Sequence, residues 1–73
     1  MMHDVGNGWK ASIGRSEAND VRIVTISPFG VVTDNTIDSK YGYDADKVIA
    51  FVRNASGLTF VDRAFADMVK GLF

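Results

Sequence analysis

The sequence contains no cysteine and only one histidine, His3, among its 73 residues. The absence of cysteine excludes disulfide bonds and thiolate metal ligands, and a single histidine cannot supply the clustered imidazoles of most zinc sites. A histidine–nucleophile pair would have to rely on His3, which lies in a segment that we expect to be mobile. We therefore expect a protein that is not an enzyme and that has no metal or cofactor site.

The sequence also has no marked excess of positive or negative charge and no long apolar run. Eight Lys and Arg stand against nine Asp and Glu, and both signs are interspersed along the chain. Proteins that hold nucleic acid through its phosphates concentrate basic residues on one surface, so nucleic acid is not expected as the primary partner. No segment approaches the ~20 apolar residues that are needed to span a bilayer. The N-terminal residues also do not show the pattern of a signal peptide, in which basic residues are followed by an apolar run. These features predict a cytoplasmic protein without a membrane partner.

Two short motifs lack the context that their chemistry needs. The glycines of residues 6–11 match the letters of a dinucleotide-binding fingerprint, but no strand precedes them and a strand pattern follows. A calcium loop starting at Asp34 would need Gly and Glu where Ser39 and Ala45 stand. We therefore interpret the Asp residues of this region as turn and cap residues.

What is present is the hydrophobic pattern of one small α+β domain spanning residues 1–73. Alternating apolar residues in 9–14 and β-branched residues in 21–27 predict two strands. The Ser-Pro-Phe-Gly segment that follows is typical of a turn, so residues 31–33 are expected to return as a third strand. Residues 1–8 are expected to form a flexible arm because of their Gly-Asn-Gly segment.

Two helices are predicted after a polar loop at 34–43, into which the third strand could extend at 36–37. Asp44 is the expected N-cap of the first helix and Gly57 its C-cap. Its apolar stripe consists of Val48, Ile49, Val52 and Ala55. The second helix is predicted over 59–73, with a stripe made of Val61, Ala64, Phe65, Met68, Val69 and Leu72. We predict that both helices cover one face of a three-stranded antiparallel sheet.

Aromatic and basic side chains are the candidates for partner binding. Aromatic residues are enriched in protein interfaces and also stack on bases. The candidates are Trp9, Lys10, Arg15, Arg22, Phe29, Tyr41 and Tyr43. One alternative is that Trp9 and one tyrosine only close the core. Another is an RNA-binding module, in which Lys10, Arg15, Arg22 and Lys40 lie beside the two tyrosines.

The length of 73 residues, the opening segment Met-Met-His-Asp-Val-Gly-Asn-Gly-Trp and the cysteine-free α+β pattern also carry a resemblance. The chain resembles the small transcription regulators with which lytic Xanthomonas phages take over the RNA polymerase of their host. The resemblance implies a non-enzymatic protein that binds the N-terminal region of the polymerase β′ subunit in the host cytoplasm. Such binding weakens σ-factor attachment, inhibits initiation and lets elongating polymerase pass terminators. We expect a monomer, and an antagonist of another host complex remains the alternative.

Overall fold

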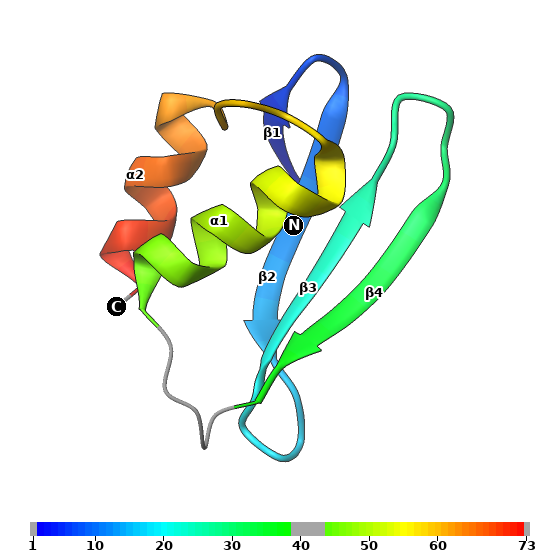
Figure 1. The fold of residues 1–73 in the computed structure, drawn as a ribbon. Coiled ribbons are helices and arrows are strands. Elements are labelled where there is room, and N and C mark those ends of the chain that lie inside the picture. Colours follow the sequence, from blue (N-terminus) through cyan, green and yellow to red (C-terminus); the bar gives the residue numbers. More distant parts are fainter. Residues whose placement is uncertain (1, 39–43, 73) are drawn as a thin grey trace.

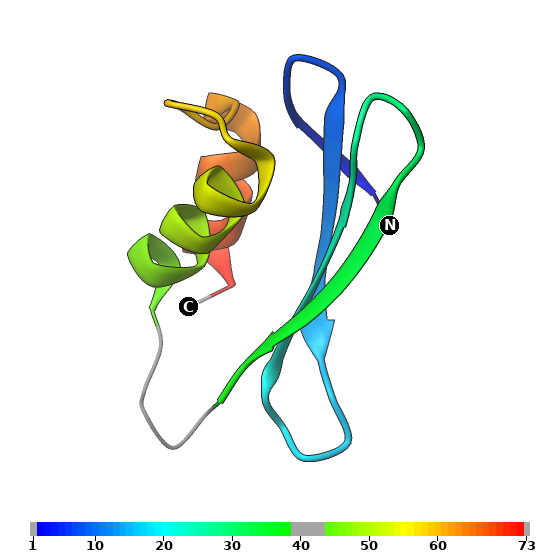
Figure 2. The same cartoon turned by 45° about the vertical axis from the view of Figure 1, so that its right-hand side comes forward.

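The computed structural model describes residues 2–38 and 44–72, which form four strands and two helices (Figure 1). The elements are β1 (His3–Gly6), β2 (Trp9–Arg15), β3 (Val21–Ile26), β4 (Val32–Ile37), α1 (Ala45–Ser56) and α2 (Arg63–Gly71). The strands make one antiparallel sheet in the order β1-β2-β3-β4. Both helices lie on the same face of this sheet (Figure 2). The α+β class is confirmed, but the prediction of three strands is wrong, because the sheet has four.

The additional strand is formed by the segment that we expected to be a flexible arm. β1 pairs with β2 through a two-residue turn, Asn7-Gly8, whose φ angles are 50° and 81°. Positive φ at both central residues is the geometry of the tight hairpin turn that Asn-Gly favours. Val5 is fully buried, and His3 lies against Phe65 with 6.3 Å between the ring centroids. Residues 3–8 are therefore part of the packed sheet and do not form a flexible arm.

The β3–β4 hairpin is longer than predicted. Its turn holds Ser27 to Gly30 as expected, with the Gly30 N–H donating to the Ser27 carbonyl oxygen at 2.9 Å. Pairing then runs without a register shift from Ile26 opposite Val32 to Val21 opposite Ile37. The loop predicted at 34–43 is thus strand up to Ile37, and its residues 39–43 lie outside the described part of the chain. Polar β4 residues are tolerated because their side chains on one face meet solvent.

The helix ends follow local capping chemistry. Asp44 caps α1 by accepting from the Lys47 N–H at 2.9 Å, and Gly57 ends it with φ 69° in the left-handed region, as predicted. The second helix begins later than predicted, at Arg63, because Asp62 is its N-cap and accepts from the Ala64 N–H at 2.9 Å. The preceding residues 58–61 form an irregular link between the helices.

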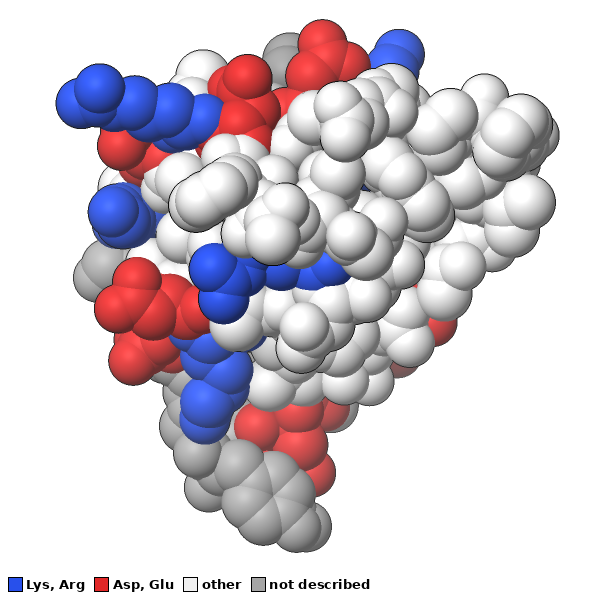
Figure 3. All heavy atoms as spheres, turned by 45° about the horizontal axis from the view of Figure 1, so that its top comes forward, with Lys and Arg blue, Asp and Glu red and all other residues white. Residues whose placement is uncertain are grey.

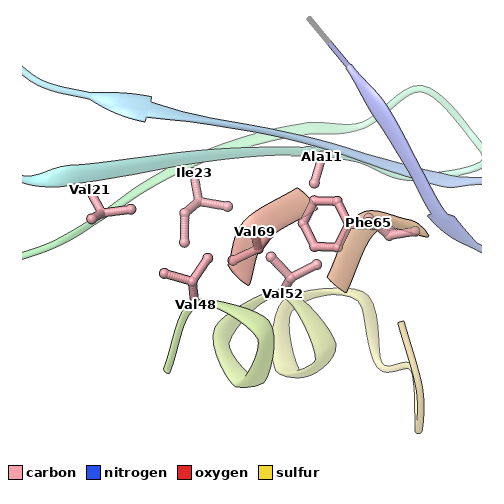
Figure 4. Close-up of a cluster of buried hydrophobic side chains, with 8 residues drawn as sticks. Ala11, Val21, Ile23, Val48, Val52, Phe65 and Val69 are labelled. Atoms are coloured by element: carbon pink, nitrogen blue, oxygen red, sulfur yellow. The ribbon is translucent and has the colours of Figure 1, made fainter. Parts of the chain in front are cut away.

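The core lies between the helices and the inward side of the sheet (Figure 4). α1 packs over β3, and α2 packs over β1. Alternate strand residues point to this layer, as the period of two in a strand requires. The buried apolar side chains are Val5, Ala11, Val21, Ile23, Val48, Val52, Phe65 and Val69. Burying one such side chain completely contributes about 1.5–3 kcal/mol.

Three stripe residues are not buried as predicted. Ala55 and Ala64 are exposed, and Leu72 is 55% exposed. On α1 the buried position is Ser56, whose hydroxyl donates to the Val52 carbonyl oxygen at 2.7 Å. Val48 and Val52 are buried as predicted, so only the last position of the α1 stripe lies one residue further along the helix than apolarity alone indicates. No helix in the described residues has the length and apolar character needed to cross a membrane.

We predict that Phe65→Ala destabilises the domain by about 3–5 kcal/mol, because it empties a buried aromatic site. Phe65 is 2% exposed, whereas Phe60, five residues earlier on the link, is 81% exposed. The control Phe60→Ala should change stability by no more than about 0.5 kcal/mol. Urea unfolding of both variants measures the difference, and equal losses would show that Phe65 does not carry the core.

We also predict that Gly8→Ala lowers stability by about 1–2 kcal/mol, the cost of a left-handed backbone for a residue with a side chain. Gly8 has φ +81°, and an added Cβ would lie 3.3 Å from Cβ and Cγ of Pro28. Gly14 is the matched control, because it lies outside the left-handed region and an added Cβ meets no atom within 4 Å. Thermal unfolding should show a lower Tm for Gly8→Ala alone. Similar Tm values for both variants would contradict this interpretation of the turn.

Candidate protein-binding surface

The predicted binding residues do not gather at one place. Phe29 lies at the tip of the β3–β4 hairpin and is 94% exposed. Trp9 is half-buried against the core, as in the alternative reading in which it closes the core. Tyr41 and Tyr43, together with Lys40, lie outside the described residues.

The basic candidates are not all in one place, because Arg15 and Arg22 line one shallow concavity whereas Lys10 lies apart from them. Lys10 and Arg15 stand at the two ends of β2, about 17 Å apart along the strand. Arg15 also donates from its guanidinium to the Asn19 carbonyl oxygen at 3.3 Å, within the β2–β3 turn. Arg22 is engaged by Asp34 on the neighbouring strand. Among the described residues, these cations do not form the continuous stripe that a phosphate backbone would follow.

Three chain connections meet at one end of the molecule, above the sheet in Figure 1. They are residues 6–8, 27–31 and 57–61, and we call this surface the turn end. A Cβ added at Gly8 would touch Pro28, and one added at Gly6 would lie 3.5 Å from Leu58 Cδ1. The first hairpin turn therefore lies against both the second hairpin turn and the helix link. Glycine at these two positions allows the three connections to approach closely.

The turn end carries no charged residue, although charged residues make up 23% of the chain. Figure 3 brings this end forward and shows a broad uncharged area on its right-hand side; most Lys, Arg, Asp and Glu lie at the left and along the margins, and one basic side chain crosses the middle of the view. Two large apolar side chains stand on it, Phe29 at 94% and Phe60 at 81% exposure. Val31 is exposed beside Phe29, and Val32 continues the apolar surface onto β4. Such a concentration of exposed apolar residues is typical of a surface that a partner covers.

Phe60 and the two valines were not among the predicted site residues. The signal for Phe60 was present, because it does not fit the helical stripe on either side of it. The strand pattern of the valines does not indicate which face of the sheet each of them lies on. Their exposure follows from the position of β4 at the edge of the sheet and of the valines at its turn end, whereas Ile37 at the other end of the strand packs against the core.

The face of the sheet that the helices do not cover carries one well-formed ion pair. Arg22 Nε donates to both carboxylate oxygens of Asp34 at 3.0 and 3.1 Å, and its NH2 group contacts Asp34 Oδ2. These hydrogen bonds hold the pKa of Asp34 below its ordinary value, and the Arg22 charge adds to the effect. The same pair raises the pKa of Arg22. Both side chains are about half exposed, so the pair organises the surface more than it stabilises the fold.

The described residues offer little space for a small ligand. A hollow of about 140 Å³ lies between Ile13, Gly14, Arg15, Val21 and Leu72. Pockets that enclose drug-sized ligands have volumes of about 300–1,000 Å³. A wider concavity beside the β2–β3 turn is shallow and carries both signs of charge, from Arg15, Glu17, Arg22 and Asp34. Within residues 2–38 and 44–72, no group of three or more His, Asp or Glu side chains is arranged to hold a metal ion.

We predict a pH-dependent difference between the wild type and Asp34→Asn. Because the folded-state pKa of Asp34 is lowered, its pair with Arg22 stabilises the fold fully above the unfolded-state pKa of about 3.9. This contribution is lost as the pH falls through the lower folded-state pKa. The wild type should therefore have the higher Tm at pH 7, and the difference should close once the pH falls below the folded-state pKa of Asp34. In the Arg22→Gln background, Asp34→Asn should no longer change the pH profile, and a persisting difference would contradict the pairing.

Comparison of the chain with protein-family models, with curated proteins and with solved structures gave no match.

Proposed function

We propose that this chain is a non-catalytic regulator that binds a larger protein through its turn end. The observation that carries the proposal is the presence of two nearly uncovered phenylalanines, Phe29 and Phe60, on a surface without charges. Interface cores are depleted of charged residues and enriched in aromatic ones, and a few aromatic anchors supply most of the affinity. Uncovered phenylalanine in a small protein has a cost in solubility that a binding role would explain.

The turn end would form the centre of such a contact. A standard interface takes about 800 Å² and about 20–30 residues from each partner. That area is about a sixth of the 4700 Å² surface of this chain. The three connections together contain 13 residues, so residues that flank them, such as Val32 on β4, would also take part.

The partner in this proposal is bacterial RNA polymerase, bound at the N-terminal region of its β′ subunit. Support for this partner comes from the resemblance to the Xanthomonas phage regulators, and the turn end is the surface that would make the contact. Binding that disfavours σ attachment needs a coupling free energy of only about 1–3 kcal/mol between the two sites. This action inhibits initiation and favours passage through terminators, and it requires neither a cofactor nor a reaction centre.

We predict that the double substitution Phe29→Ser and Phe60→Ser weakens binding to purified polymerase at least about tenfold, since each anchor should contribute more than about 1 kcal/mol. Leu72→Ser is the matched control, because Leu72 is a 55% exposed apolar residue at the C-terminus of α2. It should leave the dissociation constant unchanged. Calorimetric titration measures both affinities, and circular dichroism verifies the fold.

Two results would contradict the proposal. Unchanged affinity in the folded double variant would exclude the turn end as the binding surface. Binding that survives this substitution, falls steeply with salt and requires nucleic acid would instead favour the RNA-binding alternative.

A further inference from the structure

The outer edge of β4 presents unpaired backbone groups at three alternate residues. The Ser27 N–H donates to the Val31 carbonyl oxygen at 2.9 Å. Ser27 and Val31 are therefore a hydrogen-bonded pair at the turn end of the β3–β4 ladder. In an antiparallel pair these positions alternate, so Thr33, Asn35 and Ile37 bond to β3. The N–H and C=O groups of Val32, Asp34 and Thr36 therefore point away from the sheet. In Figures 1 and 2, no described element lies beyond β4 on that side.

The opposite edge of the sheet is protected. β1 has only four residues, and its register with β2 shifts between Asp4 and Gly6. The carbonyl oxygen of Val5 accepts a hydrogen bond from the Asp62 N–H at 2.8 Å, so the helix link covers this edge. Short length, irregular register and a covering segment are the means by which proteins prevent edge-to-edge association.

β4 has none of these devices. Its six residues, Val-Thr-Asp-Asn-Thr-Ile, include no proline and no lysine, and all six pair in register with β3. A regular edge with free donors and acceptors is a template for another strand. The contrast between the two edges of one small sheet is the basis of the inference.

We propose that the β4 edge binds an extended segment of the partner protein, which adds a fifth strand to the sheet. The inference names the mode of contact and rests on the proposed role of the chain in protein binding. The segment would bond to the backbone of Val32, Asp34 and Thr36, whichever direction it runs. Its alternate side chains would lie beside those of the same three residues, on the face that the helices leave uncovered.

The side chains at this edge specify the chemistry of the segment. Val32 is 62% exposed and lies next to the apolar turn end, so it favours an apolar residue opposite. Asp34 has lone pairs beyond those that Arg22 occupies, so it favours Lys or Arg opposite. Opposite charges across a strand pair stabilise it, and like charges destabilise it. The occupant is therefore a strand that presents an apolar residue and, two positions away, a basic residue.

A second copy of this chain fits the edge less well. Full antiparallel overlap of two β4 edges would pair Val32 with Thr36 and would set Asp34 directly opposite Asp34 of the other copy. Two carboxylates at that distance repel each other. Asp34 therefore disfavours self-association at the same edge that accepts a basic strand.

The test uses the ¹⁵N-labelled protein and a capped seven-residue peptide in which one Val and one Lys, two positions apart, alternate with Thr. Added at millimolar concentration, the peptide should slow hydrogen exchange at the amides of Val32, Asp34 and Thr36. The amides of Thr33 and Asn35, already bonded to β3, should keep their rates. The matched peptide with Glu in place of Lys should bind about fivefold more weakly. Thr36→Pro, which removes one outward donor, should also weaken binding.

The following results would contradict the binding of a partner segment at the β4 edge. No protection, or protection spread over the turn-end amides, would exclude strand addition at β4. Protection that rises with protein concentration in the absence of peptide would show that the occupant is a second copy. The proposed function fails separately, because it depends on polymerase binding by the variants Phe29→Ser and Phe60→Ser. Loss of polymerase binding in these variants without protection at β4 would leave the proposed function standing and remove this inference alone.

Discussion

The hydrogen bond from the Asp62 N–H to the Val5 carbonyl oxygen joins the first strand to the start of the last helix. Asp62 is also the N-cap of α2, so the same residue starts the helix and fixes its position on the sheet. From there Phe65 and Val69 reach the core, and Phe65 packs beside His3. The bond also holds the helix link against Gly6, which brings the three connections of the turn end together. The stability of the domain and the shape of its candidate surface therefore depend on one junction.

That junction makes the two sides of the sheet unequal. With α2 packed over β1 and α1 over β3, the helices lie toward the β1 edge, and β4 forms the opposite edge, with Ile37 packed against the core at its far end. A domain of this size has too little apolar surface to cover every edge and face. The sheet therefore has an open edge at β4, one face that the helices do not cover, and an apolar surface at the turn end. These uncovered features are the surfaces on which the proposed partner contact depends.

The sequence allowed the α+β class, the two helices and most of the core to be predicted, because capping residues and apolar periodicity act locally. Asp44 and Gly57 are examples, since each controls a helix end through bonds to neighbouring backbone groups. β1 was missed although Asn7-Gly8 is a strong hairpin signal, because Val5 is a single buried residue without an alternating pattern around it. The exposure of Phe60 was indicated by its position outside the helical stripe, but the exposure of Val32 could not be predicted, since it depends on the tertiary neighbours that this residue receives. Most of the candidate site is of this tertiary kind, and only Phe29, at a predictable turn, was identified in advance.

The turn end and the β4 edge are continuous, because the β3–β4 hairpin passes from Phe29 through Val31 into Val32. A partner segment lying along β4 would therefore reach the turn end at one of its two ends. Strand addition over three outward residues gives a weak contact by itself, and two exposed phenylalanines give a modest one. When both contacts are made by one partner, the second forms intramolecularly, at an effective concentration that reaches the millimolar range for short connections. A small rigid domain could in this way bind a large enzyme tightly without an extensive flat interface. Its specificity would come from Asp34, because only a strand with a suitable basic residue matches both contacts at once.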